Sequence, residues 1–410
     1  MSSASVGWVA RRLAGALQRR LAPARVRLEL WDGSSPYDGV DPPVGALVVR
    51  DARTLRRVLF DPHLHFGETY MTGTLEVRGG LEPVLEAVSR LSLTPTLRDR
   101  LTLRFPPANT PRRSRRNVHH HYDLGNDFYS GWLDRELLYT CAYFEHPDLT
   151  LERAQIAKMD LVCRKLRLRP GETVVEAGCG WGALALHMAR EYGVRVKAFN
   201  ISREQTAYAR TRAAREGLAS QVEFIEDDYR NVRGEYDVFV SVGMLEHVGL
   251  KHFPSLAAVL TRAVRRTCGR GLLHFIGRDQ PRPLNAWIRR RIFPGGYPPA
   301  LAEVATRVLA PARMSILDVE NLRLHYARTL AHWSRRFAAM GDQVRTRYSE
   351  EFRRAWELYL AGSEAAFVTG SLQLFQVVFA PAEADPPHWT RAEIYRSAGP
   401  RASYELIGLD

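Results

Sequence analysis

Cysteine, lysine and long apolar runs are all scarce in this sequence. Its four cysteines form no CxxC pair, which argues against a zinc knuckle and a redox-active dithiol, so we expect reduced thiols. No segment approaches the roughly 18 apolar residues that a membrane-spanning helix needs. The first helix-like segment, residues 8–21, carries four arginines and so lacks the apolar core of a signal peptide. These absences predict a cytoplasmic protein.

The composition is that of a folded globular chain with a basic charge balance. Hydrophobic residues make up 45% and charged residues 25% of the 410 residues, which argues against a disordered or fibrous chain. The formal net charge is +13, and only four of the 58 basic residues are lysine. This balance favours an anionic partner, either nucleic acid or the phosphates of a lipid surface. Genomic base composition would explain the preference for arginine but not the sign of the charge.

Three parts follow one another along the chain. Residues 1–90 combine a basic amphipathic segment with short alternating runs separated by turn-forming Asp, Gly and Pro, which indicates a small N-terminal α+β domain. Residues 91–117 are basic and interrupted by prolines, as is typical of a linker. Residues 118–410 form the third and largest part, and no repeat of about 20 to 50 residues is present.

From residue 170 onward, strand, tight turn and helix alternate, which predicts a doubly wound, mostly parallel α/β sheet. We expect strands at 173–177, 194–199, 222–225, 236–242, 272–276, 315–319 and 374–379. The segments between the last three strands are too long to be simple crossovers. We expect them to cap the carboxyl edge of the sheet, where such folds bind ligands.

A glycine-rich turn follows the first of these strands. It contains Gly178, Gly180 and Gly182. Such glycines permit a tight turn and the close approach of a nucleotide-like ligand. The preceding Glu176 suits a ligand that carries a cation, and Asn200 stands where a dinucleotide site would place an acidic residue. The pattern therefore favours S-adenosylmethionine over NAD. Asp227 and Asp228 are either acceptors for the adenine amino group or a solvated strand end.

Six separated motifs occur in order along the chain. They are HYDLGNDFY at 121–129, YTCAYF at 139–144, EAGCGWG at 176–182, SVGMLEHVG at 241–249, IFPGGY at 292–297 and LRLHY at 322–326. As a set they resemble the cyclopropane-fatty-acyl-phospholipid synthase family, which includes the mycolic acid cyclopropane synthases, over residues 117–395. Residues 1–90 also resemble the N-terminal lipid-associated domain of the bacterial long-form synthases.

The resemblance implies a Rossmann-like class I methyltransferase sheet with helical cap insertions. It also implies an enzyme that transfers a one-carbon unit from S-adenosylmethionine to the cis double bond of an unsaturated acyl chain in a membrane phospholipid. The expected product is a cyclopropane fatty acid. The same transfer can instead give a methylene- or methyl-branched chain of the 10-methyl type, or a hydroxylated one, and the sequence does not choose between them.

The family's functional residues can be carried over position by position. The resemblance implies cofactor contacts at Tyr122, Tyr139, Thr140, Gly178, Gly180, Gly182, Asn200, Gln205, Asp227 and Asp228, in addition to Glu176. It implies a bicarbonate site at Cys141, Glu246, His274, Ile276 and Tyr326. Two positions depart from the pattern. Ser363 replaces a cysteine that some members carry, which excludes a thiol nucleophile there, and Asn200 replaces a common threonine.

The chemistry explains why these residue types are needed. An alkene is a weak nucleophile, so it must be held in line with the sulfonium methyl in an apolar, closed pocket. The resulting carbocation closes to a ring only when a base removes a proton from the new methyl group, and bound bicarbonate can be that base. His274 and Tyr326 are candidate donors to the anion, and Glu246 either accepts the ion's own proton or orients its neighbours.

Basic segments that also contain apolar and aromatic residues suit docking on an anionic membrane surface. They are residues 8–21, 112–116 and 286–293. Solvated helix faces would have the same pattern, so both interpretations stay open. With docking, the protein would be cytoplasmic and peripherally associated with the inner face of the membrane. A homo-oligomer is possible.

Two other classes of function compete with this interpretation. The basic charge could serve an RNA methyltransferase, but no RNA-binding module is recognisable, so we expect no nucleic acid partner. A non-catalytic lipid- or cofactor-binding protein would not need Glu246, His274 and Tyr326 together. We also expect no metal, because the consecutive side chains of His119, His120 and His121 cannot converge on one ion.

Overall fold

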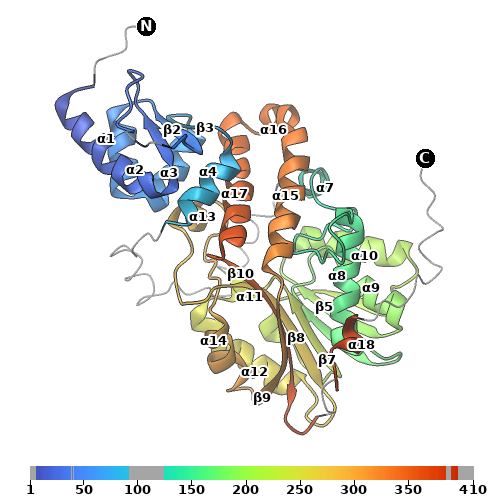
Figure 1. The fold of residues 1–410 in the computed structure, drawn as a ribbon. Coiled ribbons are helices and arrows are strands. Elements are labelled where there is room, and N and C mark those ends of the chain that lie inside the picture. The colour runs from blue at the N-terminus through green and yellow to red at the C-terminus, as the bar shows by residue number, and fades with distance from the viewer. Residues whose placement is uncertain (1–5, 38, 40, 92–123, 385–388, 396–410) are drawn as a thin grey trace.

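The computed structural model describes residues 6–37, 39, 41–91, 124–384 and 389–395 (Figure 1). Nearly all of the predicted linker, the basic segment 112–116, the three consecutive histidines and Tyr122 therefore lie outside the described residues. Within the described ranges, no helix is both long and apolar enough to cross a membrane.

The N-terminal unit is a three-stranded sheet covered by helices. Its elements are α1 (Trp8–Leu21), η1 (Ala22–Ala24), β1 (Val26–Glu29), β2 (Gly45–Val49), α2 (Ala52–Phe60), α3 (Pro62–Met71), β3 (Leu75–Arg78) and α4 (Leu81–Ser89). β2 lies in the middle, parallel to β1 and antiparallel to β3. Asp51 and Asp61 cap α2 and α3 by accepting hydrogen bonds from backbone N–H groups. Alternating apolar residues such as Leu28, Leu47 and Leu75 form its core.

The main sheet has seven strands in the order β6-β5-β4-β7-β8-β10-β9. They are β4 (Thr173–Ala177), β5 (Arg195–Asn200), β6 (Val222–Glu226), β7 (Val238–Val242), β8 (Arg270–Gly277), β9 (Met314–Asn321) and β10 (Gln373–Pro381). All seven predicted strands are thus confirmed. The first five strands are mutually parallel, and β10 pairs antiparallel with both β8 and β9.

Helices cover both faces of this sheet because alternate strand residues point to opposite sides. On one face Val174, Val196 and Val238 pack with residues of α8 (Leu151–Lys165), α9 (Ala183–Tyr192) and α10 (Arg203–Arg215). On the other face Val175 and Phe239 pack with α12 (Phe253–Ala263) and the π-helical turn η4 (Ala305–Leu309). The described residues also include several short helical elements: η2 (Tyr229–Asn231), α11 (Leu245–Val248), η3 (Leu250–His252), α14 (Leu301–Val304) and α18 (Ala392–Tyr395).

A helical cap stands at one end of the sheet (Figure 1). It contains α7 (Asn126–Ser130), α13 (Ala286–Arg291), α15 (Arg323–Ala339), α16 (Gly341–Arg347) and α17 (Glu350–Thr369). Its core is aromatic, with the rings of Phe128, Trp132, Trp333 and Trp356 within about 5 to 6 Å of their neighbours. The insertion between β9 and β10 caps the sheet as expected. The insertion between β8 and β9 does so only in part, because α14 and η4 pack beside α12 on the sheet face instead.

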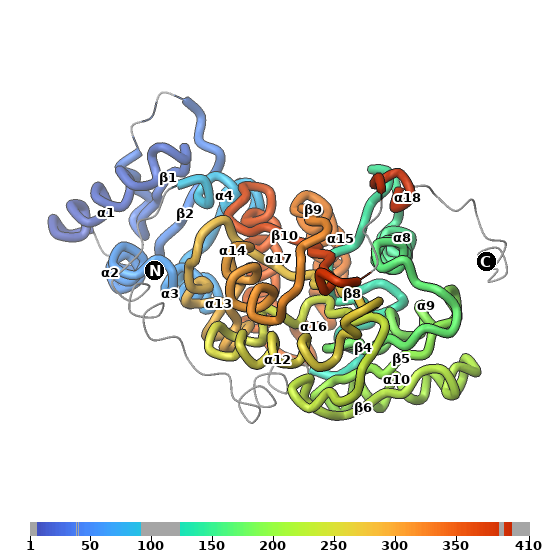
Figure 2. Tube along the Cα trace, turned by 90° about the horizontal axis from the view of Figure 1, so that it is seen from below, coloured from blue at the N-terminus to red at the C-terminus, as the bar shows by residue number. Residues whose placement is uncertain are grey.

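The N-terminal unit packs against this cap. Helices α3 and α4 contact α17, and α3 also contacts α13 (Figures 1 and 2). The Arg354 guanidinium lies 4.2 Å from the centroid of the Tyr70 ring and donates to the Tyr70 carbonyl, while the Tyr70 hydroxyl donates to Glu357 at 3.1 Å. The Glu68 carboxylate accepts two hydrogen bonds from the Arg291 guanidinium in a bidentate pair. These contacts join segments about 220 to 290 residues apart in the chain.

Candidate active site

The glycine-rich turn between β4 and α9 has the backbone shape that its sequence predicts. Gly178 has a φ of +86° and Gly180 a φ of +54°, both in the left-handed region that favours glycine. A Cβ on Gly178 would lie 2.9 Å from the Cβ of Met244, whereas one on Gly180 would meet no heavy atom within 4 Å. The backbone at Gly180 therefore faces open space and allows the close approach of a ligand.

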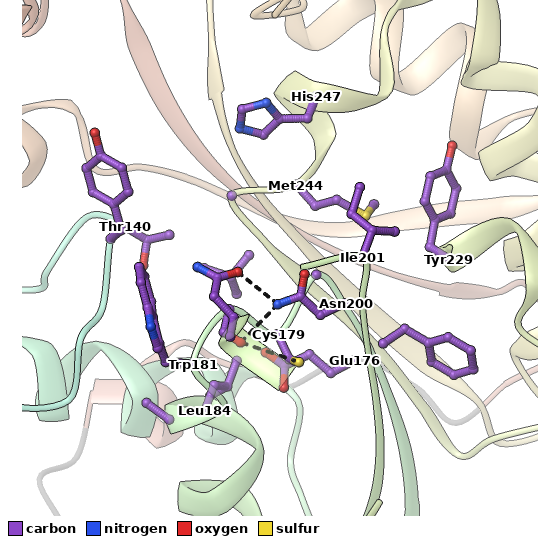
Figure 3. A pocket seen from close by; sticks show the side chains of 18 of the residues that line it. Thr140, Glu176, Cys179, Trp181, Leu184, Asn200, Ile201, Tyr229, Met244 and His247 are labelled. Carbon is purple, nitrogen blue, oxygen red and sulfur yellow. Dashed lines mark hydrogen bonds between the residues drawn. The ribbon is translucent and has the colours of Figure 1, made fainter. Parts of the chain in front are cut away.

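That open space belongs to a cavity of about 150 Å³, named here the turn cavity (Figure 3). Nine of the predicted cofactor residues line it: Tyr139, Thr140, Glu176, Gly178, Gly180, Asn200, Gln205, Asp227 and Asp228. In Figure 3 Thr140 and Trp181 lie on one side of the cavity, Tyr229 lies on the other and Asn200 lies between them. The carboxyl ends of β4, β5 and β6 thus meet the segment before α8, which supplies Tyr139 and Thr140, so that the cavity joins residues up to 89 positions apart in the chain.

Among the predicted cofactor residues that the structure describes, Gly182 alone does not line this cavity. Its φ is +87°, and an added Cβ would lie 2.6 Å from the Phe224 ring. Gly182 is the N-cap of α9 and lets this helix pack closely on the sheet. The structure thus gives Gly182 a packing role, and its contact with the cofactor stays a prediction.

The Asn200 side chain links three segments that surround the turn cavity by hydrogen bonds. Its side-chain amide donates to the Gly180 carbonyl at 3.0 Å and to the Gln205 side-chain oxygen at 2.9 Å. Its oxygen accepts from the backbone N–H of Ser202 at 3.1 Å. One side chain thus connects the glycine turn to the start of α10, which gives a structural reason for asparagine at the end of β5.

We expect Asn200→Ala to weaken S-adenosylmethionine binding roughly tenfold, because losing buried hydrogen bonds costs about 1 to 2 kcal/mol. Isothermal titration calorimetry measures this directly. Thr211→Ala, which removes an exposed hydroxyl on α10, is the control and should leave the affinity unchanged. Equal affinities for wild type and Asn200→Ala would contradict the role given to this side chain.

A buried charge cluster forms one wall of the turn cavity. The Lys158 ammonium is 1% exposed and donates to the Thr140 hydroxyl at 2.8 Å. Burial lowers the pKa of Lys158 and raises the pKa of Glu176 to about 8. The positive charge of Lys158 partly offsets the rise at Glu176. A cationic ligand beside Glu176 would favour its ionised form. The expectation that Glu176 faces a positively charged cofactor stays a prediction.

A second cavity of about 1150 Å³, named here the large cavity, adjoins the turn cavity. Both cavities are lined by Tyr139, Thr140, Gly243 and His247. Most of the other side chains around the large cavity are apolar, including Phe66, Leu85, Val88, Trp287, Phe293, Leu330, Leu358, Phe367 and Leu374. Helices α3 and α4 of the N-terminal unit thus contribute to its wall together with α13, α15 and α17. Its volume exceeds the range of roughly 300 to 1,000 Å³ that is typical of small-molecule sites.

The five residues predicted to bind bicarbonate all line the large cavity. They are Cys141, Glu246, His274, Ile276 and Tyr326. One carboxylate oxygen of Glu246 accepts a hydrogen bond from the backbone N–H of Ile276, so this N–H orients Glu246 instead of serving as an open donor. The other oxygen of Glu246 and the Nε2 atom of His274 are buried without a hydrogen-bond partner among the described residues. A small hydrogen-bonding anion would satisfy both of these buried polar atoms.

Burial sets the protonation states in this group. It raises the pKa of Glu246 to about 7 and lowers the pKa of His274 well below its usual range, so His274 is neutral. Burial also raises the pKa of the Cys141 thiol far above 9, and this thiol donates to the Ala142 carbonyl at 3.1 Å. Cys141 is therefore neither a thiolate nor a nucleophile in this environment.

Comparison with known proteins identifies the family. Residues 109–377, more than half of the chain, match the family model described as mycolic acid cyclopropane synthetase. The chain belongs to the mycolic acid cyclopropane synthetase family. It is therefore an S-adenosylmethionine-dependent methyltransferase that resembles cyclopropane-fatty-acyl-phospholipid synthases. Residues 16–94 match a separate domain of unknown function, DUF7884.

Relatives and solved structures agree with this assignment to the cyclopropane synthetase family. A probable fatty acid methyltransferase from Pseudomonas putida is 35% identical over 90% of this chain and 96% of its own length. The cyclopropane-fatty-acyl-phospholipid synthase of Escherichia coli strain K12 is 37% identical over 85% of this chain and 89% of its own length. The crystal structure of mycolic acid cyclopropane synthase CmaA1 complexed with SAH and CTAB is 31% identical, with a TM-score of 0.61, and covers 65% of this chain and 97% of that protein. The predicted class I methyltransferase fold is confirmed.

Sequence reasoning missed several residues that line the two cavities. Lys158, Tyr359 and the residues of α3 and α4 have no recognisable signal, because they reach the site only through tertiary packing. Trp181 and His247 could have been included, since they lie inside the motifs that contain Gly180 and Glu246. Tyr359 matters because its hydroxyl lies 2.7 Å from that of Tyr139, where the cap meets the boundary between the cavities.

Proposed function

We propose that this protein transfers a one-carbon unit from S-adenosylmethionine to the cis double bond of an unsaturated acyl chain in a membrane phospholipid, forming a cyclopropane. The observation that carries the proposal is that the turn cavity, which most of the predicted cofactor residues line, meets a much larger cavity at Tyr139, Thr140, Gly243 and His247. The Escherichia coli relative is named for a fatty-acyl-phospholipid product, and the structural relative CmaA1 binds SAH.

In this proposal each cavity has one occupant. The turn cavity holds the cofactor, with its charged part beside Glu176 and its adenosine part toward the carboxyl ends of β5 and β6. The large cavity holds the acyl chain against apolar side chains of the cap and the N-terminal unit. Aromatic rings at the junction stabilise positive charge on the acyl chain by about 1 to 2 kcal/mol in a desolvated site, and the ring of Phe293 contacts both His247 and Tyr359 there.

Ring closure requires a base beside the new methyl group. Bicarbonate, when bound, would supply that base, and the orphaned polar atoms of Glu246 and His274 fit it. When bicarbonate is bound, the carboxylate oxygen of Glu246 would accept the ion's hydroxyl proton, while the neutral His274 ring would donate from Nε2. The apolar walls exclude water, which would otherwise capture the cationic acyl chain.

The test is a transfer assay with purified protein, S-adenosylmethionine labelled in its methyl group, and vesicles that contain dioleoyl phosphatidylglycerol. Label in the phospholipid acyl chains as a cyclopropane ring, with the double bond lost and no hydrogen added, supports the proposal. Label with unsaturation retained, or in a branched saturated chain, would indicate the methyl-branching alternative, which the name of the Pseudomonas putida relative also fits. Transfer to free oleate only, or to RNA, would contradict the phospholipid assignment.

We further propose that the N-terminal unit docks on an anionic membrane. Trp8, Val9 and Phe60 are 70%, 62% and 75% exposed, which is unusual for large apolar side chains. Trp8 and Val9 begin helix α1, which also carries Arg11 and Arg12 on its exposed surface. Apolar side chains beside arginines are typical of helices that lie at a lipid interface.

Binding to vesicles that contain anionic phospholipid should therefore fall steeply between low and high salt, because screening weakens the attraction of arginines to lipid phosphates. Co-sedimentation at increasing sodium chloride concentrations measures this. Trp8→Ser should weaken binding at every salt concentration, whereas Leu324→Ser, which changes an exposed apolar residue of the cap, serves as the control. Binding that does not respond to salt would overturn the docking proposal.

A further inference from the structure

Three polar side chains form a row across three adjacent strands. His274 on β8 is the register partner of Gln376 on β10, and Gln376 is the register partner of Glu320 on β9. Lys165, the last residue of α8, lies over this row with its side chain fully buried. Its ammonium donates to Glu320 and to the Gln376 side-chain oxygen, the latter at 2.7 Å. The Gln376 amide nitrogen lies 3.1 Å from Nδ1 of His274.

The chemistry of these groups allows one arrangement of protons. A lysine ammonium has donors only, so the Gln376 atom that faces Lys165 must be its oxygen. The NH2 group of Gln376 therefore faces His274 and donates to Nδ1, which must then carry a lone pair. In a neutral imidazole the single proton is consequently on Nε2. Nε2 is the buried atom that has no partner among the residues the structure describes, and His274 lines the large cavity.

We infer that Lys165 and Gln376 are positioning residues that fix the tautomer of His274, so that its Nε2–H group is a hydrogen-bond donor toward an anion in the large cavity. The role of that anion as the base rests on the proposed function, whereas the proton position does not. The opposite tautomer would present a lone pair, which would repel an anion. A neutral His274, kept so by burial and by the charges of Lys158 and Lys165, is required for the tautomer to matter.

The arrangement also separates two tasks around the anion site. Glu246, oriented by the Ile276 N–H, presents an acceptor, and His274, oriented by Gln376, presents a donor. Bicarbonate has both a hydroxyl donor and acceptor oxygens, so the pair matches it in a way that two donors or two acceptors would not. Each side chain proposed to touch the anion is thus oriented by another hydrogen bond: Glu246 by the backbone N–H of Ile276, and His274 by the Gln376 amide.

The test is ¹⁵N NMR of the histidine rings in the full-length protein without cofactor, with His274→Asn used to assign the resonances. Wild type is expected to show Nδ1 unprotonated and Nε2 protonated at neutral pH. Gln376→Glu keeps an oxygen for Lys165 but turns a second oxygen toward Nδ1, so Nδ1 should become protonated. The matched control, Gln373→Glu, adds the same charge three residues away on β10 and should leave the His274 pattern as in wild type.

Two outcomes overturn the inference: a protonated Nδ1 in wild type, or an unchanged pattern in Gln376→Glu that has folded. If Gln376→Glu does not fold, Lys165→Met provides the second route, because it frees the Gln376 amide to rotate and should make a second His274 tautomer visible. Addition of sodium bicarbonate alone should shift the Nε2 resonance in wild type. Absence of that shift with the expected tautomer would contradict bicarbonate as the base but leave the positioning role intact. Turnover in Gln376→Glu should fall at least roughly tenfold.

Discussion

Glu246→Gln is expected to lower turnover by roughly a hundredfold or more, the usual contribution of a group that manages a proton at the reacting centre. Glutamine has the same size, and its oxygen can still accept from the Ile276 N–H. The other atom would then be an NH2 donor instead of an acceptor. The site would keep its shape but could no longer accept the hydroxyl proton of a bound bicarbonate.

Affinity for S-adenosylmethionine should be unchanged in Glu246→Gln, because Glu246 does not line the turn cavity. Methyl transfer kinetics and calorimetry on the same preparation separate these two effects. Glu303→Gln is the matched control: Glu303 is also a buried carboxylate, but it lies outside both cavity walls and accepts from the Tyr297 hydroxyl. Full activity of Glu246→Gln would refute the assignment of this residue.

The second large effect is expected from filling the large cavity at Gly362. This glycine lies within α17 and lines the cavity, and a Cβ added there would meet no heavy atom within 4 Å. A leucine side chain would therefore extend into the space proposed for the acyl chain. We expect Gly362→Leu to reduce turnover on dioleoyl phospholipid at least roughly tenfold, since a displaced substrate loses its alignment with the methyl donor.

The same substitution should not destabilise the fold. Glycine inside a helix is less favourable than most residues by about 0.5 to 1 kcal/mol, so both Gly362→Leu and Gly362→Ala should melt at or above the wild-type temperature. Gly362→Ala adds one methyl group and should keep most of the activity, which makes it the size control. Wild-type kinetics for Gly362→Leu would mean that the acyl chain does not lie along α17.

Local patterns sufficed where local physics decides the structure. The seven strands were predictable because short runs of strand-forming residues are separated by turn-forming residues. The turn at Gly178 and Gly180 was predictable because glycine readily adopts the positive φ values that such a turn needs. The family resemblance implied Glu246, His274 and Tyr326 as members of one site, and all three line the large cavity although they lie on α11, β8 and α15. Glu246 and His274 meet because β7 and β8 are parallel neighbours that end at the same edge of the sheet, whereas Tyr326 reaches them from the cap.

Features of the site that depend on tertiary packing could not be predicted from the sequence. Gly182 looked equivalent to Gly180, yet its neighbour is the Phe224 ring and not the cavity. The N-terminal unit resembled a separate domain, and its sequence gave no sign that Phe66 and Leu85 would form part of the large cavity wall. Lys165 and Gln376 are 211 positions apart, so their contact depends on how α8 lies on the sheet.

The most direct test of the account uses S-adenosylmethionine with a trideuterated methyl group and analyses the acyl chains of the phospholipid product by mass spectrometry. The account predicts that the chain gains one carbon bearing two deuterium atoms and loses its double bond, because a base has removed one deuteron from the new methyl group. An acyl chain that retains all three deuterium atoms, or label found anywhere other than on an acyl chain, would contradict it.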